Sequence, residues 1–197
     1  MVFLRGFSVK RVDQLVLVIS FVGFSWLAMQ AVHESGHVLG AWFSGADIEK
    51  VVLHPLTISR TDISYNPHPL VEIWAGPLAG ILFPLAALLV AWRLHAPRLY
   101  LFRFFAAFCL VANGVYIGLD SFGGSGDAAE LVHYGTPRFL LVAFGLAAFT
   151  SGMLLWNGLG PQFGFGEAKG RVERNAAIVS LSLFTLIVLV EVLLDSR

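Results

Sequence analysis

The most chemically suggestive residues in the sequence form the run His33-Glu34-Ser35-Gly36-His37, which has the spacing HExxH. On a helix, residues four apart lie on the same face, so both imidazoles could reach a single zinc ion. Glu34 lies beside them, where a carboxylate can take a proton from a water molecule. The run therefore predicts a zinc centre suited to hydrolysis.

Two histidines leave zinc short of the third protein ligand that catalytic sites usually have. Two acids downstream, Asp120 and Asp127, lie in a glycine-rich stretch that would allow close packing of the backbone. Asp127 also precedes Ala-Ala-Glu-Leu, where a helix N-cap is expected. The residues by themselves leave both acids open as the third ligand.

The elements that must position these groups are apolar. The chain is 57% hydrophobic and only 13% charged, against about 25% charged in soluble domains. The apolar residues gather in five long segments, at about 14–32, 73–92, 99–119, 139–159 and 175–194. Most of these approach the roughly 20 residues that a membrane-spanning helix needs. We expect an all-α integral membrane protein of about five transmembrane helices, forming a single polytopic domain over residues 1–197.

The connection between the first two segments differs in pattern. Residues 44–70 contain β-type residues such as Val51, Val52 and Ile63, interrupted by Pro55 and Pro67. This composition predicts a small β-hairpin at the membrane surface, directly after the HExxH run.

Charge is distributed unevenly among the connections. Lys and Arg gather near the N-terminus and in the second and fourth connections, whereas the third carries Asp120, Asp127 and Glu130. By the positive-inside rule, the first and third connections face outside, so His33 should lie near the outer face of the membrane. The net charge of zero gives no basic surface for nucleic acid. The single cysteine, Cys109, cannot form an internal disulfide.

The HExxH run, followed by Trp74-Ala-Gly-Pro-Leu-Ala-Gly80, resembles the site-2 protease (M50) family of intramembrane zinc metalloproteases. The resemblance covers about residues 20–135. It implies that His33 and His37 bind zinc and that Glu34 is the catalytic residue. In that family an Asn is followed by a Leu-Asp-Gly or Asp-Gly segment whose Asp is the third ligand.

The downstream segment departs from this pattern. Prolines are missing between Asn113 and Asp120, and neither Asp120 nor Asp127 is followed by Gly. The run Asp127-Ala-Ala-Glu-Leu131 is closer to the compact M50B-like branch. On this resemblance we favour Asp127 over Asp120 as the third zinc ligand.

The resemblance implies a zinc metalloendopeptidase that hydrolyses peptide bonds in or next to transmembrane segments of membrane proteins. Its setting would be the lipid bilayer, in a bacterial inner (plasma) membrane, and its oligomeric state stays open. One alternative is a catalytically inactive zinc-binding membrane protein that acts as a binding partner or chaperone. A small transporter is a further alternative, but acids and histidines do not recur at mid-membrane positions of several segments, as a relay path requires.

Overall fold

A computed structural model describes residues 9–195 of the chain. Within that range, five helices are long and apolar enough to cross a membrane. They are α1 (Val9–Ser44), α2 (Pro69–Arg93), α3 (Leu99–Asp120), α5 (Arg138–Trp156) and α6 (Arg174–Asp195). The short helix α4 (Gly126–His133) and the 3₁₀ turns η1 (Gly160–Phe163) and η2 (Gly166–Ala168) lie in the connections. The predicted helical membrane fold is confirmed.

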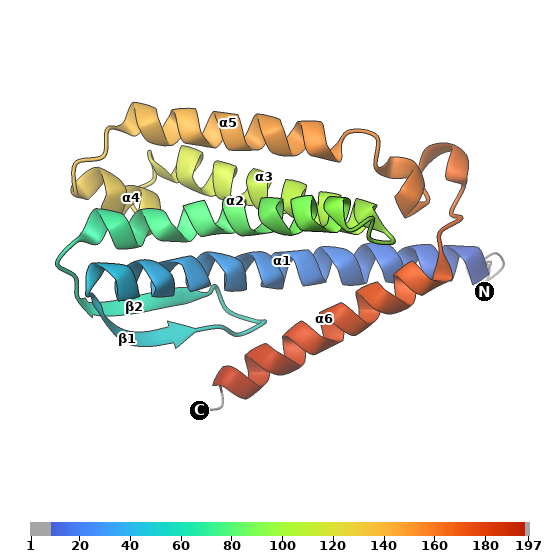
Figure 1. Cartoon of the computed structure of the whole chain (residues 1–197), viewed down its shortest axis with the longest axis horizontal. Coiled ribbons are helices and arrows are strands. Elements are labelled where there is room, and N and C mark those ends of the chain that lie inside the picture. Colours follow the sequence, from blue (N-terminus) through green and yellow to red (C-terminus); the bar gives the residue numbers. More distant parts are fainter. Residues whose placement is uncertain (1–8, 196–197) are drawn as a thin grey trace, which may run out of the picture.

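The two ends of the bundle differ in character. Figure 1 shows the start of α1, the α2–α3 turn and the α5–α6 connection at one end, and the hairpin, the start of α2 and α4 at the other. The first end has an aromatic and aliphatic core around Leu17, Phe21 and Phe163. The HExxH run belongs to the second end, because α1 has 36 residues and continues through His33 and His37, directly after the predicted apolar stretch.

The hairpin after α1 is also confirmed. Strands β1 (Asp47–Val52) and β2 (Arg60–Tyr65) pair antiparallel, with Val51 opposite Thr61. The connecting residues 53–59 have no strand structure, although several of them are β-type, because Pro55 lacks the N–H that a strand ladder needs. The register of the pair shifts twice near Ile48, as it does at a β-bulge.

Small residues allow α1 and α2 to approach closely next to the HExxH run. A Cβ added at Gly40 would lie 2.6 Å from the Cβ of Ala75, and one added at Gly36 would meet Ala79 at the same distance. Gly76 faces the ring of His37 so closely that no Cβ fits between them. The Trp74–Gly80 run thus provides a flat helix surface against which His37 lies, a small-residue contact typical of membrane helices.

Helix α4 is attached to the bundle by its apolar side. Ala128 and Leu131 are fully buried and pack with Ile73 of α2, Ile117 of α3 and Leu141 of α5. The N-cap of α4 is Ser125, and Asp127 is the second residue of the helix. The prediction of Asp127 as the N-cap is therefore wrong: the helix already begins at Gly126, and the carboxylate of Asp127 contacts the histidines of α1 instead.

Candidate metal centre

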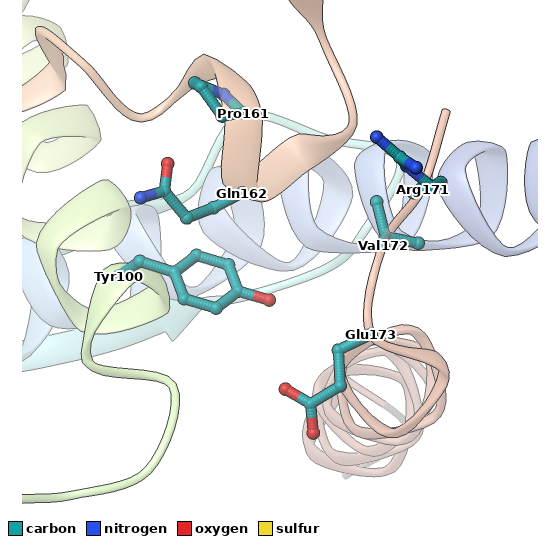
Figure 2. A pocket seen from close by; sticks show the side chains of 6 residues that line it. All are labelled: Tyr100, Pro161, Gln162, Arg171, Val172 and Glu173. Atoms are coloured by element: carbon teal, nitrogen blue, oxygen red, sulfur yellow. The ribbon is translucent and has the colours of Figure 1, made fainter. Parts of the chain in front are cut away.

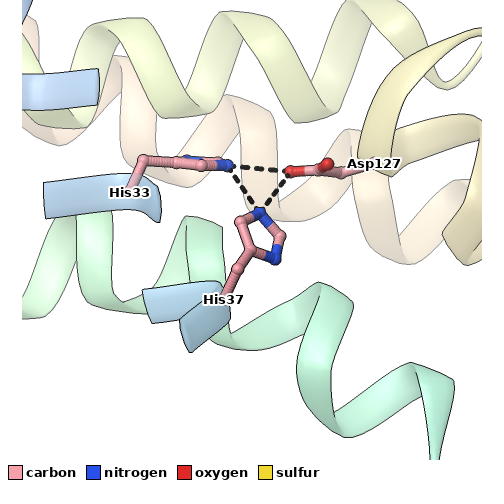
Figure 3. Close-up of side chains that lie close together, drawn as sticks. All are labelled: His33, His37 and Asp127. Carbon is pink, nitrogen blue, oxygen red and sulfur yellow. Dashed lines mark hydrogen bonds and ion pairs between the residues drawn. The ribbon is translucent and has the colours of Figure 1, made fainter. Parts of the chain in front are cut away.

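Three side chains from two distant parts of the chain converge at the hairpin end of the bundle. Nε2 of His33 lies 3.0 Å from Nε2 of His37, and Oδ2 of Asp127 lies 2.8 Å from the first nitrogen and 3.2 Å from the second (Figure 3). Among the described residues, these three form a group of metal-ligating atoms that could hold one ion. Helical spacing places the histidines, and the docking of α4 brings in the acid.

The opposite nitrogen of each imidazole has its own acceptor. Nδ1 of His33 donates to Oδ1 of Asn113 at 2.7 Å, and the amide of Asn113 is held by its own donation to the carbonyl of Cys109 at 2.9 Å. Nδ1 of His37 donates to Oε1 of Glu72 at 2.8 Å. With a hydrogen on each Nδ1, a neutral ring presents a lone pair at Nε2, the tautomer that a metal ligand requires.

The donor set suits zinc. If both rings are neutral with hydrogen on Nδ1, two nitrogen lone pairs and a carboxylate oxygen face one another within about 3 Å, an arrangement that a cation between them stabilises. Zinc takes His nitrogen and carboxylate oxygen, and three protein ligands leave a fourth position for water or substrate. The atoms are somewhat closer to one another than ligands of a bound ion, so binding would move them slightly apart.

Asp127 is held by its backbone as well as its carboxylate. Its N–H donates to the hydroxyl of Tyr116 at 3.1 Å, and Gly126 leaves room for that ring. Burial alone would raise the pKa of Asp127, but the two histidines beside its carboxylate outweigh it and the net effect lowers the pKa. The carboxylate is therefore an anion at neutral pH. Burial and the charges of Asp127 and Glu72 raise the pKa of the neighbouring Glu130.

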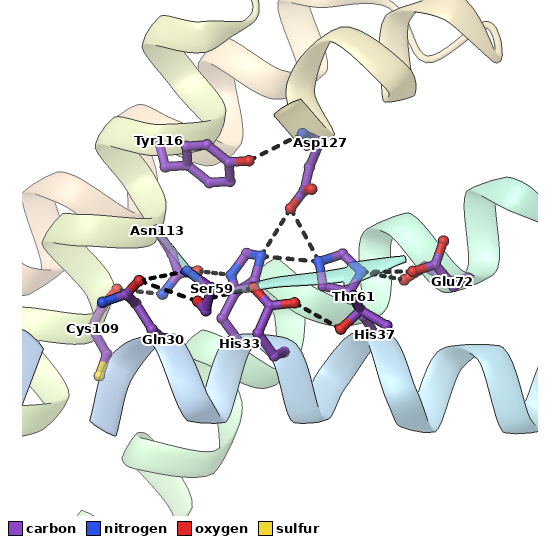
Figure 4. Close-up of polar contacts among 11 residues, drawn as sticks. Gln30, His33, His37, Ser59, Thr61, Glu72, Cys109, Asn113, Tyr116 and Asp127 are labelled. Carbon is purple, nitrogen blue, oxygen red and sulfur yellow. Dashed lines mark hydrogen bonds and ion pairs between the residues drawn. The ribbon is translucent and has the colours of Figure 1, made fainter. Parts of the chain in front are cut away.

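Glu34 is buried and is held by the hairpin. Its Oε1 accepts from the hydroxyl of Ser59 at 3.2 Å, and its Oε2 accepts from the hydroxyl of Thr61 at 2.7 Å. Gln30, one helical turn earlier, accepts from the backbone N–H of Ser59 at 3.1 Å. Figure 4 shows the partners Gln30, Ser59 and Thr61 beside the His–His–Asp group. The hairpin thus orients the carboxylate that the HExxH spacing places next to the histidines.

The His–His–Asp group, Glu34 and the residues that hold them line one large cavity of about 1350 Å³. The cavity is bounded by α1, α3, α4, the start of α2 and strand β2, and it has apolar walls at Trp26, Met29 and Val115. A smaller cavity of about 300 Å³ at the opposite end of the bundle is lined by Tyr100, Arg171 and Glu173, among others, and offers no histidine or cysteine (Figure 2).

Asp120 and three further histidines of this part of the chain lie outside the group. Asp120, the last residue of α3, lines the cavity but is not among the three atoms that converge. His133 is exposed at its rim. His54 lies in the hairpin turn and His68 precedes α2, and neither belongs to the group.

Several polar residues of the site were not expected from the sequence. No sequence motif of metal-binding or catalytic residues includes them; they are Glu72, Asn66, Ser59, Thr61 and Tyr116. Glu72 did carry a signal, because an acid in the first turn of an apolar helix is costly unless it has a partner. The hydroxyls on the hairpin carried none, since Ser and Thr are ordinary residues in a strand at a surface.

Comparison with known proteins adds one finding. A family model described as Peptidase M50B-like matches residues 13–117, which include most of α1, the hairpin, α2 and most of α3. Neither a curated protein nor a solved structure gives a significant match to the chain.

Proposed function

Since the chain belongs to the Peptidase M50B-like family, we propose that this multi-pass membrane protein is a zinc metalloendopeptidase that cleaves membrane proteins in or next to their transmembrane segments. The observation that carries the proposal is the convergence of His33, His37 and Asp127 in a large cavity of a membrane helix bundle, beside Glu34.

In this proposal His33, His37 and Asp127 hold the metal. The support is the hydrogen bonding of the rings: both Nδ1 atoms donate to protein acceptors, so each neutral ring can present the lone pair of Nε2 to an ion. When bound, zinc supplies Lewis-acid chemistry, which polarises the scissile carbonyl and lowers the pKa of water towards about 7.

Glu34 is the proposed general base. Its carboxylate oxygen would take the proton of the attacking water and then pass it to the leaving amine nitrogen, as general acid–base catalysis requires. The support for this role is its position next to His33 on α1 and its orientation by two hydroxyl donors. A carboxylate held in place needs no reorganisation when the substrate arrives.

Strand β2 is the proposed docking edge for the substrate. A peptide bond within a helix is closed to attack, so the substrate must be extended near the metal. Residues Ile58 to Ser64 line the cavity, and β2 pairs with β1 on one side while its other edge has no strand partner among the described residues. An extended segment can add to such an edge through backbone hydrogen bonds.

The setting of this reaction would be the inner membrane of a bacterium. The five apolar helices require a bilayer, and the apolar walls of the cavity suit a substrate segment drawn from the same bilayer.

The test compares cells that produce the wild-type chain with cells that produce Glu34→Gln. This substitution keeps the size of the side chain and removes the base, so we expect the fold and bound zinc to persist while cleavage falls by at least about 100-fold. Sequencing of new protein N-termini in the membrane fraction would reveal the cleavage products, which should map in or beside transmembrane segments.

The result also separates the proposal from its alternative. If the purified protein holds zinc but the two strains give identical sets of N-termini, the chain is a zinc-binding partner or chaperone rather than a protease. If neither form holds zinc, the metal centre itself is wrong.

A further inference from the structure

Glu72 is a buried acid that the proposed reaction does not use. It lies in the first turn of α2 and is only 5% exposed. A carboxylate in an apolar helix is unfavourable unless its oxygens have good partners. Its two oxygens have different partners here, one in the candidate metal centre and one in the segment that follows the hairpin.

The first partner is His37. Nδ1 of His37 donates to Oε1 of Glu72 at 2.8 Å, and the backbone carbonyl of Glu72 lies 3.2 Å from the same nitrogen. Figure 4 shows Glu72 on one side of the ring and Asp127 on the other. Because Nδ1 and Nε2 lie on different edges of the imidazole, Glu72 faces away from the place where Nε2 would bind an ion, which excludes it as a further ligand.

The second partner is Asn66, in the segment between β2 and α2. Its Nδ2 donates to Oε2 of Glu72 at 3.2 Å. Asn66 thereby fixes the carboxylate from the hairpin side, and the hairpin is linked to His37 through two hydrogen bonds.

We propose that Glu72 is a positioning residue of the metal centre: it holds His37 in the metal-binding tautomer and makes Nε2 a stronger donor. The proposal rests on the proposed function, in which His37 is a zinc ligand. A carboxylate that accepts from Nδ1–H fixes both the tautomer and the rotation of the ring, and its charge raises the basicity of the opposite nitrogen.

The two histidines differ in the charge of the group that accepts the hydrogen bond from Nδ1. His33 donates to the neutral amide of Asn113, whereas His37 donates to a carboxylate. A charged acceptor gives a hydrogen bond about twice as strong as a neutral one. Glu72 therefore contributes more to metal affinity than an uncharged acceptor at the same place would.

The experiment measures zinc affinity of the purified full chain by competition with a chelator. Glu72→Ala should weaken zinc binding about 10- to 100-fold, the usual cost of losing such a partner. Glu72→Gln keeps an oxygen acceptor without the charge, so it should recover part of that loss. With Co²⁺ in place of zinc, the visible absorption bands of Glu72→Ala should shift, because the ring of His37 is no longer fixed.

A matched control is Glu130→Ala, which removes a carboxyl group from the same cavity without a hydrogen bond to either histidine among the described contacts. It should change zinc affinity less than Glu72→Ala does. Equal losses in the two variants would overturn the proposal in favour of a general charge effect. Thermal unfolding without metal shows whether each variant is folded. If Glu72→Ala does not fold, Glu72→Gln, which preserves the side-chain shape, replaces it in the comparison of zinc affinities.

His37→Ala separates failure of this inference from failure of the proposed function. If His37→Ala loses zinc while Glu72→Ala binds it as tightly as the wild type, Glu72 has no positioning role and the metal centre stands. If His37→Ala itself retains full zinc affinity, the proposed centre is wrong.

Discussion

Each of the three residues of the candidate centre directs one polar atom towards the other two and uses another polar atom for a hydrogen bond with the surrounding protein. His33 and His37 direct Nε2 inwards and Nδ1 outwards, and Asp127 presents Oδ2 while its N–H donates to Tyr116. These outer contacts leave the inner atoms with lone pairs and little rotational freedom. Preorganisation of this kind lowers the entropic cost of binding an ion.

The choice between the two downstream acids gives a direct prediction. Asp127→Ala removes an atom that lies 2.8 Å from Nε2 of His33, so we expect zinc affinity to fall by more than about 100-fold, beyond the usual loss for an outer contact. Asp120→Ala should leave zinc affinity near the wild-type value, because Asp120 only lines the cavity. Metal content after dialysis against a chelator measures both. The reverse ranking would move the third ligand to the end of α3.

At the scale of elements, the hairpin and the segment after it position two buried carboxylates of the site. Ser59 and Thr61 hold Glu34, and Asn66 holds Glu72, so the segment from the hairpin turn to the start of α2 touches both buried glutamates. If a substrate pairs with β2, the strand that binds it is also the strand that orients the proposed base. Substrate binding and catalysis are then mechanically linked through a single element.

Thr61→Val tests this link. Valine has nearly the same shape as threonine but cannot donate to Glu34, so the carboxylate loses the shorter of its two hydroxyl contacts. We expect kcat on an identified substrate to fall roughly 10- to 100-fold through misplacement of the base, with KM and zinc content little changed. Thr57→Val is the matched control, since that hydroxyl contacts only the exposed hairpin turn. Equal rates for the two variants would remove Thr61 from the catalytic arrangement.

The elements were more predictable than their contacts. Long uncharged runs predicted the spanning helices, and prolines among β-type residues predicted the hairpin, because both signals are local in sequence. HExxH placed His33 and His37 together for the same reason. Asp127 required a second signal, the family resemblance, since its approach depends on how α4 packs on Ile73 and Ile117. The roles of Glu72 and Thr61 depend on tertiary contacts across 35 and 27 residues, which no spacing rule contains.

At the scale of the whole molecule, positive charge separates the two ends of the bundle. Of the Lys and Arg residues in the described range, eight belong to the end opposite the candidate centre and three to its own end. The eight are Lys10, Arg11, Arg93, Arg98, Arg103, Lys169, Arg171 and Arg174, and the three are Lys50, Arg60 and Arg138. Arg103 is tied to that end by donating to the carbonyls of Leu155 and Asn157.

This asymmetry predicts the orientation of the protein. The positive-inside rule places the basic end in the cytoplasm, so the hairpin, α4 and the candidate centre should open towards the outer face. From Gln14 to His33 the helix rises about 28 Å, nearly the thickness of a hydrocarbon core of about 30 Å. If Arg11 lies at the inner boundary, His33 must lie close to the outer one.

Cysteine labelling in intact cells measures that orientation. Leu56→Cys in the hairpin turn and Ser125→Cys before α4 are at exposed positions at the centre's end, and Glu167→Cys is at an exposed position at the basic end. The native Cys109 is fully buried, so the unmodified chain gives the background. A maleimide that cannot cross the membrane should label the first two from outside and Glu167→Cys only after the cells are opened. Labelling in the opposite pattern would place the centre at the cytoplasmic face. It would not change the proposed ligands or the proposed role of Glu34, because these depend on contacts within the bundle and not on the direction of the bundle in the bilayer.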